Sequence, residues 1–165
     1  MSKAFTDEES QDSAVLGRPP SVAPRGQERP ITTEGHRALT GELQRLSTVE
    51  RARVHGLTDD AEREAQAKRL EHRLALLAAT LSSVRVVEVP APDGEVRFGS
   101  RVTLAWDDGR TQRLHLVGPD EADSKAGRVS VESPLGRTLL GQRQGDTVEV
   151  ERPRGVGCAT LVTVE

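Results

Sequence analysis

Two adjacent carboxylates, Asp59 and Asp60, stand in a short turn between two stretches of helical periodicity. Neighbouring acids in such a turn can hold a magnesium ion together with water and phosphate oxygens, and they can orient an attacking water. They can also serve the helix that follows, because Asp59 with Glu62 three positions later forms a capping-box-like pair, and Asp60 favours the positive end of the helix dipole. The sequence favours capping and leaves magnesium chemistry open.

No other set of side chains has a spacing typical of catalysis. Metal-ligand spacing is missing among the four histidines, which are His36, His55, His72 and His115. The single cysteine, Cys158, excludes an internal disulfide and a cysteine-based zinc site. A nucleophile elbow and a phosphate-binding glycine loop are both absent from the sequence. We therefore expect neither a cofactor of the chain's own nor a small-molecule substrate.

Composition narrows the class of protein further. The chain has 165 residues, a net charge of −3 and only 2% aromatic residues. Without a positive field or aromatic stacking platforms, autonomous binding to DNA or RNA is disfavoured. The longest apolar run, residues 74–81 with Thr80 inside it, is far shorter than the roughly 20 residues of a membrane span, and no secretory signal precedes it. We expect a soluble, cytoplasmic protein without a membrane partner.

Three segments must position these residues. Residues 1–30 are rich in proline and charge, and they predict a disordered tail. Residues 31–88 contain no proline and predict two antiparallel helices, the first capped by Thr32 or Thr33. Apolar residues recur there at spacings of three and four: Leu39, Leu43, Leu46 and then Val49 or Glu50, followed by Leu70, Leu74, Leu77, Leu81 and Val84. The turn at 56–60 forms the tip of this hairpin.

The third segment, residues 89–165, changes to period-two strand signals. Strands are predicted at 102–106, 111–117, 128–131, 147–151 and 159–164, and a short helix at 133–141 begins with a Ser-Pro cap. The fold class is therefore α+β, a helical hairpin followed by a compact domain. Strand-face charges explain Arg97, Arg101, Arg110 and Arg113 more simply than a basic face near nucleic acid does.

Several ordered motifs of this segment resemble the C-terminal domain of the GreA/GreB transcript cleavage factors. They are Phe98–Leu104, Leu116–Asp123, Val129–Val131, Ser133–Gly141 and Gly145–Val148. Residues 32–36 with Leu39 are similar to the start of the family's coiled coil, and residues 1–6 resemble the opening of GreB-type proteins. The resemblance covers residues 31–165. It implies a coiled-coil hairpin over 31–88 and an FKBP-like domain over 89–165.

The resemblance also implies a partner, bacterial RNA polymerase core. The hairpin would enter the secondary channel and the globular domain would dock on its rim, so nucleic acid would be met only within the elongation complex. Asp59 and Asp60 would then help position magnesium in the active centre of the polymerase, and the chain would be an accessory factor rather than an enzyme. The rim contacts would come from Pro119, Asp120, Glu121, Asp123, Ser133 and Pro134. Residues 118–120 can equally form a turn that has no docking role.

The tip departs from the family pattern, which reads Gly-Asp-Leu-Ser-Glu-Asn-Ala-Glu. Residues 56–62 align without the first Asp, and Asp59 takes the place of the functional Glu. The first helix is shorter by two to three turns and the second by about one, which withdraws the tip by at least one turn, about 5.4 Å. A non-cleaving homologue that only occupies the channel therefore stays open beside a cleavage factor. A prolyl isomerase is disfavoured by the lack of aromatics, and a coiled-coil oligomerisation module remains a further alternative.

Overall fold

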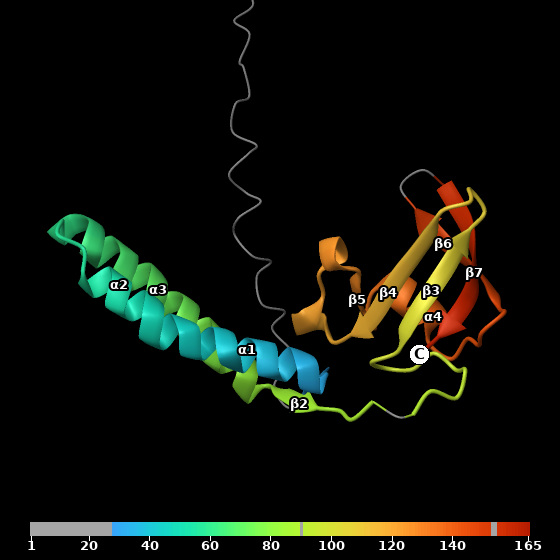
Figure 1. Ribbon diagram of the computed structural model, residues 1–165, viewed down its shortest axis with the longest axis horizontal. Coiled ribbons are helices and arrows are strands. Elements are labelled where there is room, and N and C mark those ends of the chain that lie inside the picture. Colours follow the sequence, from blue (N-terminus) through green and yellow to red (C-terminus); the bar gives the residue numbers. More distant parts are fainter. Residues whose placement is uncertain (1–27, 90, 153–154) are drawn as a thin grey trace, which may run out of the picture.

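The computed structural model describes residues 28–89, 91–152 and 155–165. The expected disordered tail falls mostly on residues 1–27, which lie outside the described part. Figure 1 shows two regions side by side along the long axis, a helical hairpin and a domain built on a curled β-sheet. The mixed α+β class predicted from the sequence is confirmed. No helix in the described part of the chain has the length and apolar character to cross a membrane.

The hairpin has two arms of equal length. The first runs through α1 (Thr33–Arg45), the π-helical η2 (Leu46–Glu50) and α2 (Arg51–His55), and the second is α3 (Asp60–Ser82). Each arm spans 23 residues, or about 34 Å at 1.5 Å per residue. Thr32 rather than Thr33 caps the first arm, because its side chain accepts a hydrogen bond from the Gly35 amide.

The apolar seam between the arms changes phase at η2. Leu46 and Val54 are buried against Leu70 and Leu74, but they are eight residues apart, whereas two α-helical turns take about 7.2 residues. The wider π turn absorbs the extra residue and keeps both side chains in the seam. It also leaves Val49 60% exposed.

The base of the hairpin carries a feature that the sequence analysis missed. Two three-residue strands, β1 (Arg29–Ile31) and β2 (Val84–Val86), pair in parallel where the chain enters and leaves the hairpin. Arg29 and Pro30 therefore belong to an ordered strand, so the predicted tail over residues 1–30 reaches two residues too far. Three residues are too short to show strand alternation, and a proline in an edge strand gives no positive signal.

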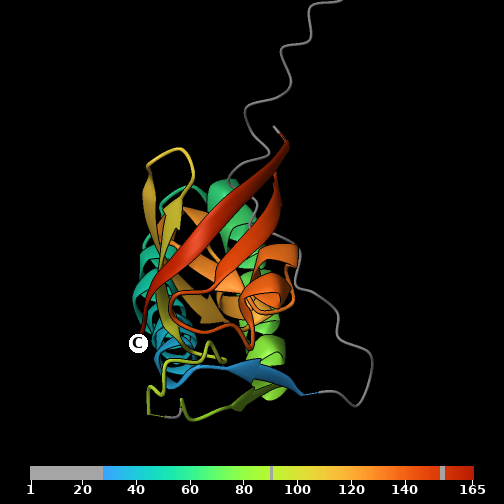
Figure 2. The same ribbon diagram turned by 90° about the vertical axis from the view of Figure 1, so that its right-hand side faces the viewer.

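The globular part is a five-stranded sheet in the order β5-β4-β3-β7-β6. Its strands are β3 (Arg101–Trp106), β4 (Thr111–Val117), β5 (Arg128–Ser130), β6 (Thr147–Arg152) and β7 (Gly155–Val164). Two short 3₁₀ helices, η3 (Pro119–Glu121) and η4 (Ser124–Ala126), connect β4 to β5, which run parallel. Helix α4 (Pro134–Leu139) contributes Leu139 to the core, and Figure 2 shows it beside β6.

The predicted strands and short helix are confirmed with small shifts of their ends. Alternate residues of β3 are buried, as the period of two requires, and the core gathers on that face of the sheet. Its most buried members include Leu104, Leu116, Leu139 and Leu161. Strand β7 begins at Gly155, four residues earlier than predicted, because β6 and β7 pair as far as Arg152↔Gly155.

Candidate functional site

Asp59 is the N-cap of the second arm. The α2 helix has its C-cap at Gly56, and two further residues lead to Asp59. The Asp59 side chain accepts a hydrogen bond of 2.7 Å from the Glu62 backbone amide. The capping interpretation is therefore confirmed for this residue. Only half of a capping box is described, since the Glu62 carboxylate accepts a bond of 2.8 Å from the Gln66 side chain. Capping fixes the carboxylate of Asp59 against the backbone of the tip.

Asp60, like Asp59, is exposed at the tip. It is the first residue of α3, its side chain is 86% exposed, and it forms an ion pair with Arg63 one turn later. Arg63 also donates a hydrogen bond of 3.1 Å to the Leu57 carbonyl, so the guanidinium ties both sides of the turn together. The tip thus presents two exposed carboxylates, one bound to the Glu62 amide and one paired with Arg63.

The two acids could supply part of a magnesium site. Among the described residues, no group of three or more histidine, cysteine, aspartate or glutamate side chains is arranged to hold a metal ion. Magnesium is commonly bound through one or two protein carboxylates, with waters and phosphate oxygens completing its octahedron. Asp59 and Asp60 are two such carboxylates, and their part in binding magnesium stays a prediction.

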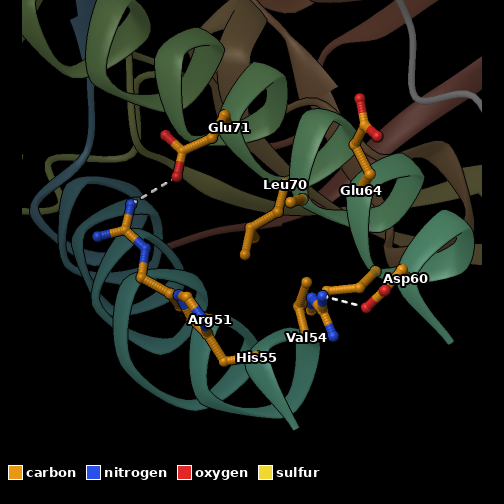
Figure 3. Close-up of a pocket in the computed structure, with 9 residues that line it drawn as sticks. Arg51, Val54, His55, Asp60, Glu64, Leu70 and Glu71 are labelled. Carbon is orange, nitrogen blue, oxygen red and sulfur yellow. Dashed lines mark hydrogen bonds and ion pairs between the residues drawn. The ribbon is translucent and has the colours of Figure 1, made fainter. Parts of the chain in front are cut away.

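A groove of about 400 Å³ lies between the arms next to the tip. Figure 3 shows Leu70 pointing from α3 into this space and Arg51 reaching across it to Glu71, at 2.8 Å. Val54 and Ala67 add to its apolar lining, and Asp60 stands at the tip end. The Arg51–Glu71 ion pair therefore joins the two arms across this groove.

The cap at Asp59 makes a prediction about stability. Asp59→Ala should lower the free energy of unfolding by about 0.5–2 kcal/mol, because the Glu62 amide loses its partner, while Asp59→Ser should stay close to wild type. Chemical denaturation followed by far-ultraviolet circular dichroism measures both. Equal losses in the two variants would contradict a capping role.

The acidic loop, residues 118–123, holds the globular part against the base of the hairpin. Asp120 pairs with Arg29 of β1 at 2.8 Å, and both side chains are less than 10% exposed. Burial raises the pKa of the Asp120 carboxyl in spite of the attraction of Arg29. This acid faces the hairpin, and its charge is directed away from solvent.

Glu121 is also turned inward. Its side chain accepts hydrogen bonds from the Thr32 amide at 2.9 Å, from the Thr32 hydroxyl, and from the Gly118 amide at 3.2 Å. The residue is only 7% exposed. The acid that the resemblance assigned to the polymerase rim therefore reaches the N-cap of α1.

The other predicted docking residues lie on either side of β5. Asp123 caps η4, and hydrogen bonds from the Ala126 and Lys125 amides, the former dominant, lower the pKa of its carboxyl. Ser133 caps α4, and Pro134, which is exposed, takes the first helical position. Since η3 and α4 both contact β5, the fold brings Pro119 and these three residues to one region.

Three of the four arginines in or beside β3 and β4 form ion pairs. Arg97 pairs with Asp93 at 2.6 Å, and Arg110 pairs with Asp108. Arg101 pairs with Glu34 of α1 at 3.0 Å, which gives the hairpin base another contact with the sheet. These pairs support the interpretation as solvated strand-face charges.

Sequence reasoning missed the partners of the acidic loop. Arg29 stands in a proline-rich stretch, and Thr32 gave only a capping signal. Thr32 and Glu121 are 89 residues apart, so no local pattern connects them. The motifs of residues 32–36 and 116–123 were each recognisable, but the contact between them was not.

Comparisons with known proteins agree on one family. A family model described as "Transcription elongation factor, GreA/GreB, C-term" matches residues 91–165. The GreA protein of Phenylobacterium zucineum is 41% identical over 151 residues, covering 82% of this chain and 96% of that protein. GreA of Hyphomonas neptunium is 39% identical over 150 residues, with the same coverage.

Solved structures give a related match. The crystal structure of GreA factor homolog 1 (Gfh1) of Thermus thermophilus is 26% identical, covers 84% of this chain and 99% of that chain, and superposes with a TM-score of 0.41. The likeness of residues 1–6 to GreB-type proteins concerns residues outside the described part. The curated relatives match this chain over most of their own length, and the chain belongs to the GreA/GreB family of transcription elongation factors.

Proposed function

We propose that this chain binds bacterial RNA polymerase through the secondary channel and acts on stalled or backtracked elongation complexes. The observation that carries the proposal is the pair of carboxylates at the free end of the hairpin, of which Asp60 is 86% exposed. Family membership supports the finer description of the chain as a coiled-coil hairpin joined to an FKBP-like domain. Nucleic acid is then reached only inside the elongation complex.

In this proposal the chain is an accessory factor that stimulates RNA cleavage by the polymerase. The polymerase supplies the active centre, and a magnesium ion held there would supply an activated water and neutralise charge on the phosphate. Asp59 and Asp60 add oxygen ligands from the tip and orient the attacking water. The factor needs no cofactor of its own.

The globular part docks on the rim of the channel in this proposal. The surface beside β5 carries the remaining residues of the predicted contact set, which are Pro119, Asp123, Ser133 and Pro134. Asp120 and Glu121 contribute indirectly, because they hold the base of the hairpin. Charge on such a surface steers association more than it adds affinity.

A second candidate is a homologue that occupies the channel without stimulating cleavage. It is favoured by the engagement of both acids, Asp59 in capping and Asp60 with Arg63. The length of the chain also supports it. The Phenylobacterium alignment has 151 positions, whereas 82% of 165 residues is about 135, so about 16 residues of the relative have no counterpart here. If those residues belong to the two arms, the tip is withdrawn by about 12 Å.

Cleavage of end-labelled RNA in backtracked elongation complexes separates the two candidates. We expect wild type to shorten the RNA and Asp59→Asn/Asp60→Asn to lose about 10²-fold in rate, the scale on which a positioned catalytic group acts. Asparagine retains the cap of α3, so the loss reports charge and not stability. Glu64→Gln, which removes a neighbouring exposed acid on α3, is the matched control and should cleave normally.

Binding to polymerase is measured in parallel with the same proteins. Tight binding by wild type with no RNA shortening would assign the chain to the channel-occupying homologues. Cleavage that survives in the double variant would remove both acids from the chemistry. Failure of wild type to bind the polymerase would contradict both candidates.

A further inference from the structure

We infer that Glu121 is a positioning residue, which fixes the direction of the hairpin by capping α1 from the globular part. The inference deepens the proposed function, because it assigns to the base of the hairpin the task of aiming the tip. It also gives Glu121 a role other than contact with a partner, since a residue that is 7% exposed offers little surface to bind.

The contacts of Glu121 are those of a helix cap supplied from a distant segment. Thr32 accepts a 2.9 Å hydrogen bond from the Gly35 amide through its hydroxyl oxygen, and donates the hydroxyl proton to Glu121. The Thr32 amide donates to the other oxygen of the same carboxylate at 2.9 Å. A negative charge at this position also interacts favourably with the N-terminal end of the α1 dipole. The carboxylate therefore replaces the water that an exposed helix end would bind.

Two glycines leave the space that this arrangement needs. A Cβ atom at Gly35 would lie 1.9 Å from the Glu121 Oε1, and one at Gly118 would lie 2.0 Å from the Pro30 carbonyl oxygen. Neither glycine requires a left-handed backbone, since neither has a positive φ. Close approach of the acidic loop to the hairpin base is therefore the reason for both.

The other contacts of the base hold the segments around the cap. The Arg29–Asp120 ion pair joins β1 to η3, and the Arg101–Glu34 pair is exposed at the start of α1. Exposed ion pairs contribute little to stability. The Glu121 carboxylate is thus the buried acceptor that meets α1 at its N-cap.

Leverage makes this contact important for function. The tip lies about 34 Å along the arm from the base, so a rotation of only about 2° at the base moves it by about 1 Å. A displacement of that size can cost about 10²-fold in rate when a reacting group must be placed. Loosening the cap should therefore lower the rate of an event at the tip more than the affinity of the globular part for its partner.

The test compares Glu121→Gln with Glu151→Gln, an exposed acid on β6, in the full chain. Spin labels at Arg69→Cys on α3 and Glu149→Cys on β6, in a Cys158→Ser background, report the distance between hairpin and sheet. We expect a narrow distance distribution for wild type and Glu151→Gln, and a broadened one for Glu121→Gln. Thr32→Val should broaden it as well, and Thr32→Ser, which restores the hydroxyl, should not.

Polymerase assays with the same variants add a second readout. We expect Glu121→Gln to bind polymerase within about twofold of wild type, while the maximal rate of RNA cleavage falls by at least about tenfold. An unchanged, narrow distance distribution in both Glu121→Gln and Thr32→Val would overturn the positioning role whatever the polymerase assays show. Failure of wild type to bind polymerase would contradict only the proposed function, because the distance measurement uses the free protein.

Discussion

Arg29→Met is expected to lower the free energy of unfolding by about 3–5 kcal/mol, because it leaves the Asp120 carboxylate buried without its partner. The double variant Arg29→Met/Asp120→Leu should recover most of this loss, since an apolar pair of similar volume carries no desolvation penalty. Urea denaturation followed by the fluorescence of Trp106, the single tryptophan, measures both variants. A double variant no more stable than the single one would show that the charges are not what matters at this contact.

The loss in Arg29→Met should also depend on pH, with a definite sign. Burial raises the pKa of Asp120, so its contribution to stability is fully present below its unfolded pKa and is lost as pH rises through the folded pKa. Removing Arg29 takes away the main opposing attraction and shifts that pKa further upward. The deficit should therefore be largest near neutral pH and should shrink on acidification, when Asp120 becomes neutral.

Gly136→Ala is expected to destabilise the globular part by about 1–3 kcal/mol or more, as overpacking does. A Cβ atom there would lie 2.1 Å from the Ser130 carbonyl oxygen and 2.9 Å from the Val131 Cα, both of which belong to the backbone. These atoms cannot rotate away, so α4 would have to move from β5.

Gly41→Ala is the matched control for this substitution. A Cβ atom at Gly41, within α1, would have nothing within 4 Å, so alanine should stabilise the hairpin by about 0.5–1 kcal/mol through its better helix propensity. The two variants should therefore change the midpoint of denaturation in opposite directions. Equal midpoints for Gly136→Ala and wild type would contradict the close approach of α4 to β5.

The elements whose signal is periodic were predictable from the sequence. Leucine spacing gave both arms of the hairpin, and period-two alternation gave β3 and β4, because burial of one face imposes these patterns locally. The sequence did not decide whether Val49 or Glu50 continues the apolar seam of the first arm, because the π turn that shifts the seam depends on how the two arms pack. In the structure Glu50 is partly buried near the seam, whereas Val49 is exposed to solvent.

The candidate site was predictable in part. The capping role of Asp59 follows from its position before a helix, and the hydrogen bond to Glu62 confirms it. The inward direction of Asp120 and Glu121 was not predictable, because an acidic loop has the same local sequence whether it faces solvent or another segment. Only the pairing of residues 89 positions apart decides between them.

The parallel pair β1–β2 has a consequence for how the length of the hairpin can be altered within this family. Because Arg29 pairs with Val84 and Ile31 with Val86, the two ends of the hairpin are fixed next to each other whatever lies between them. Seven residues added to each arm would preserve the apolar spacing and extend the hairpin by about 10.5 Å, while the junction with the sheet keeps its geometry. The hairpin is thus a separable module, whose length insertions and deletions can tune without rebuilding the domain that carries it.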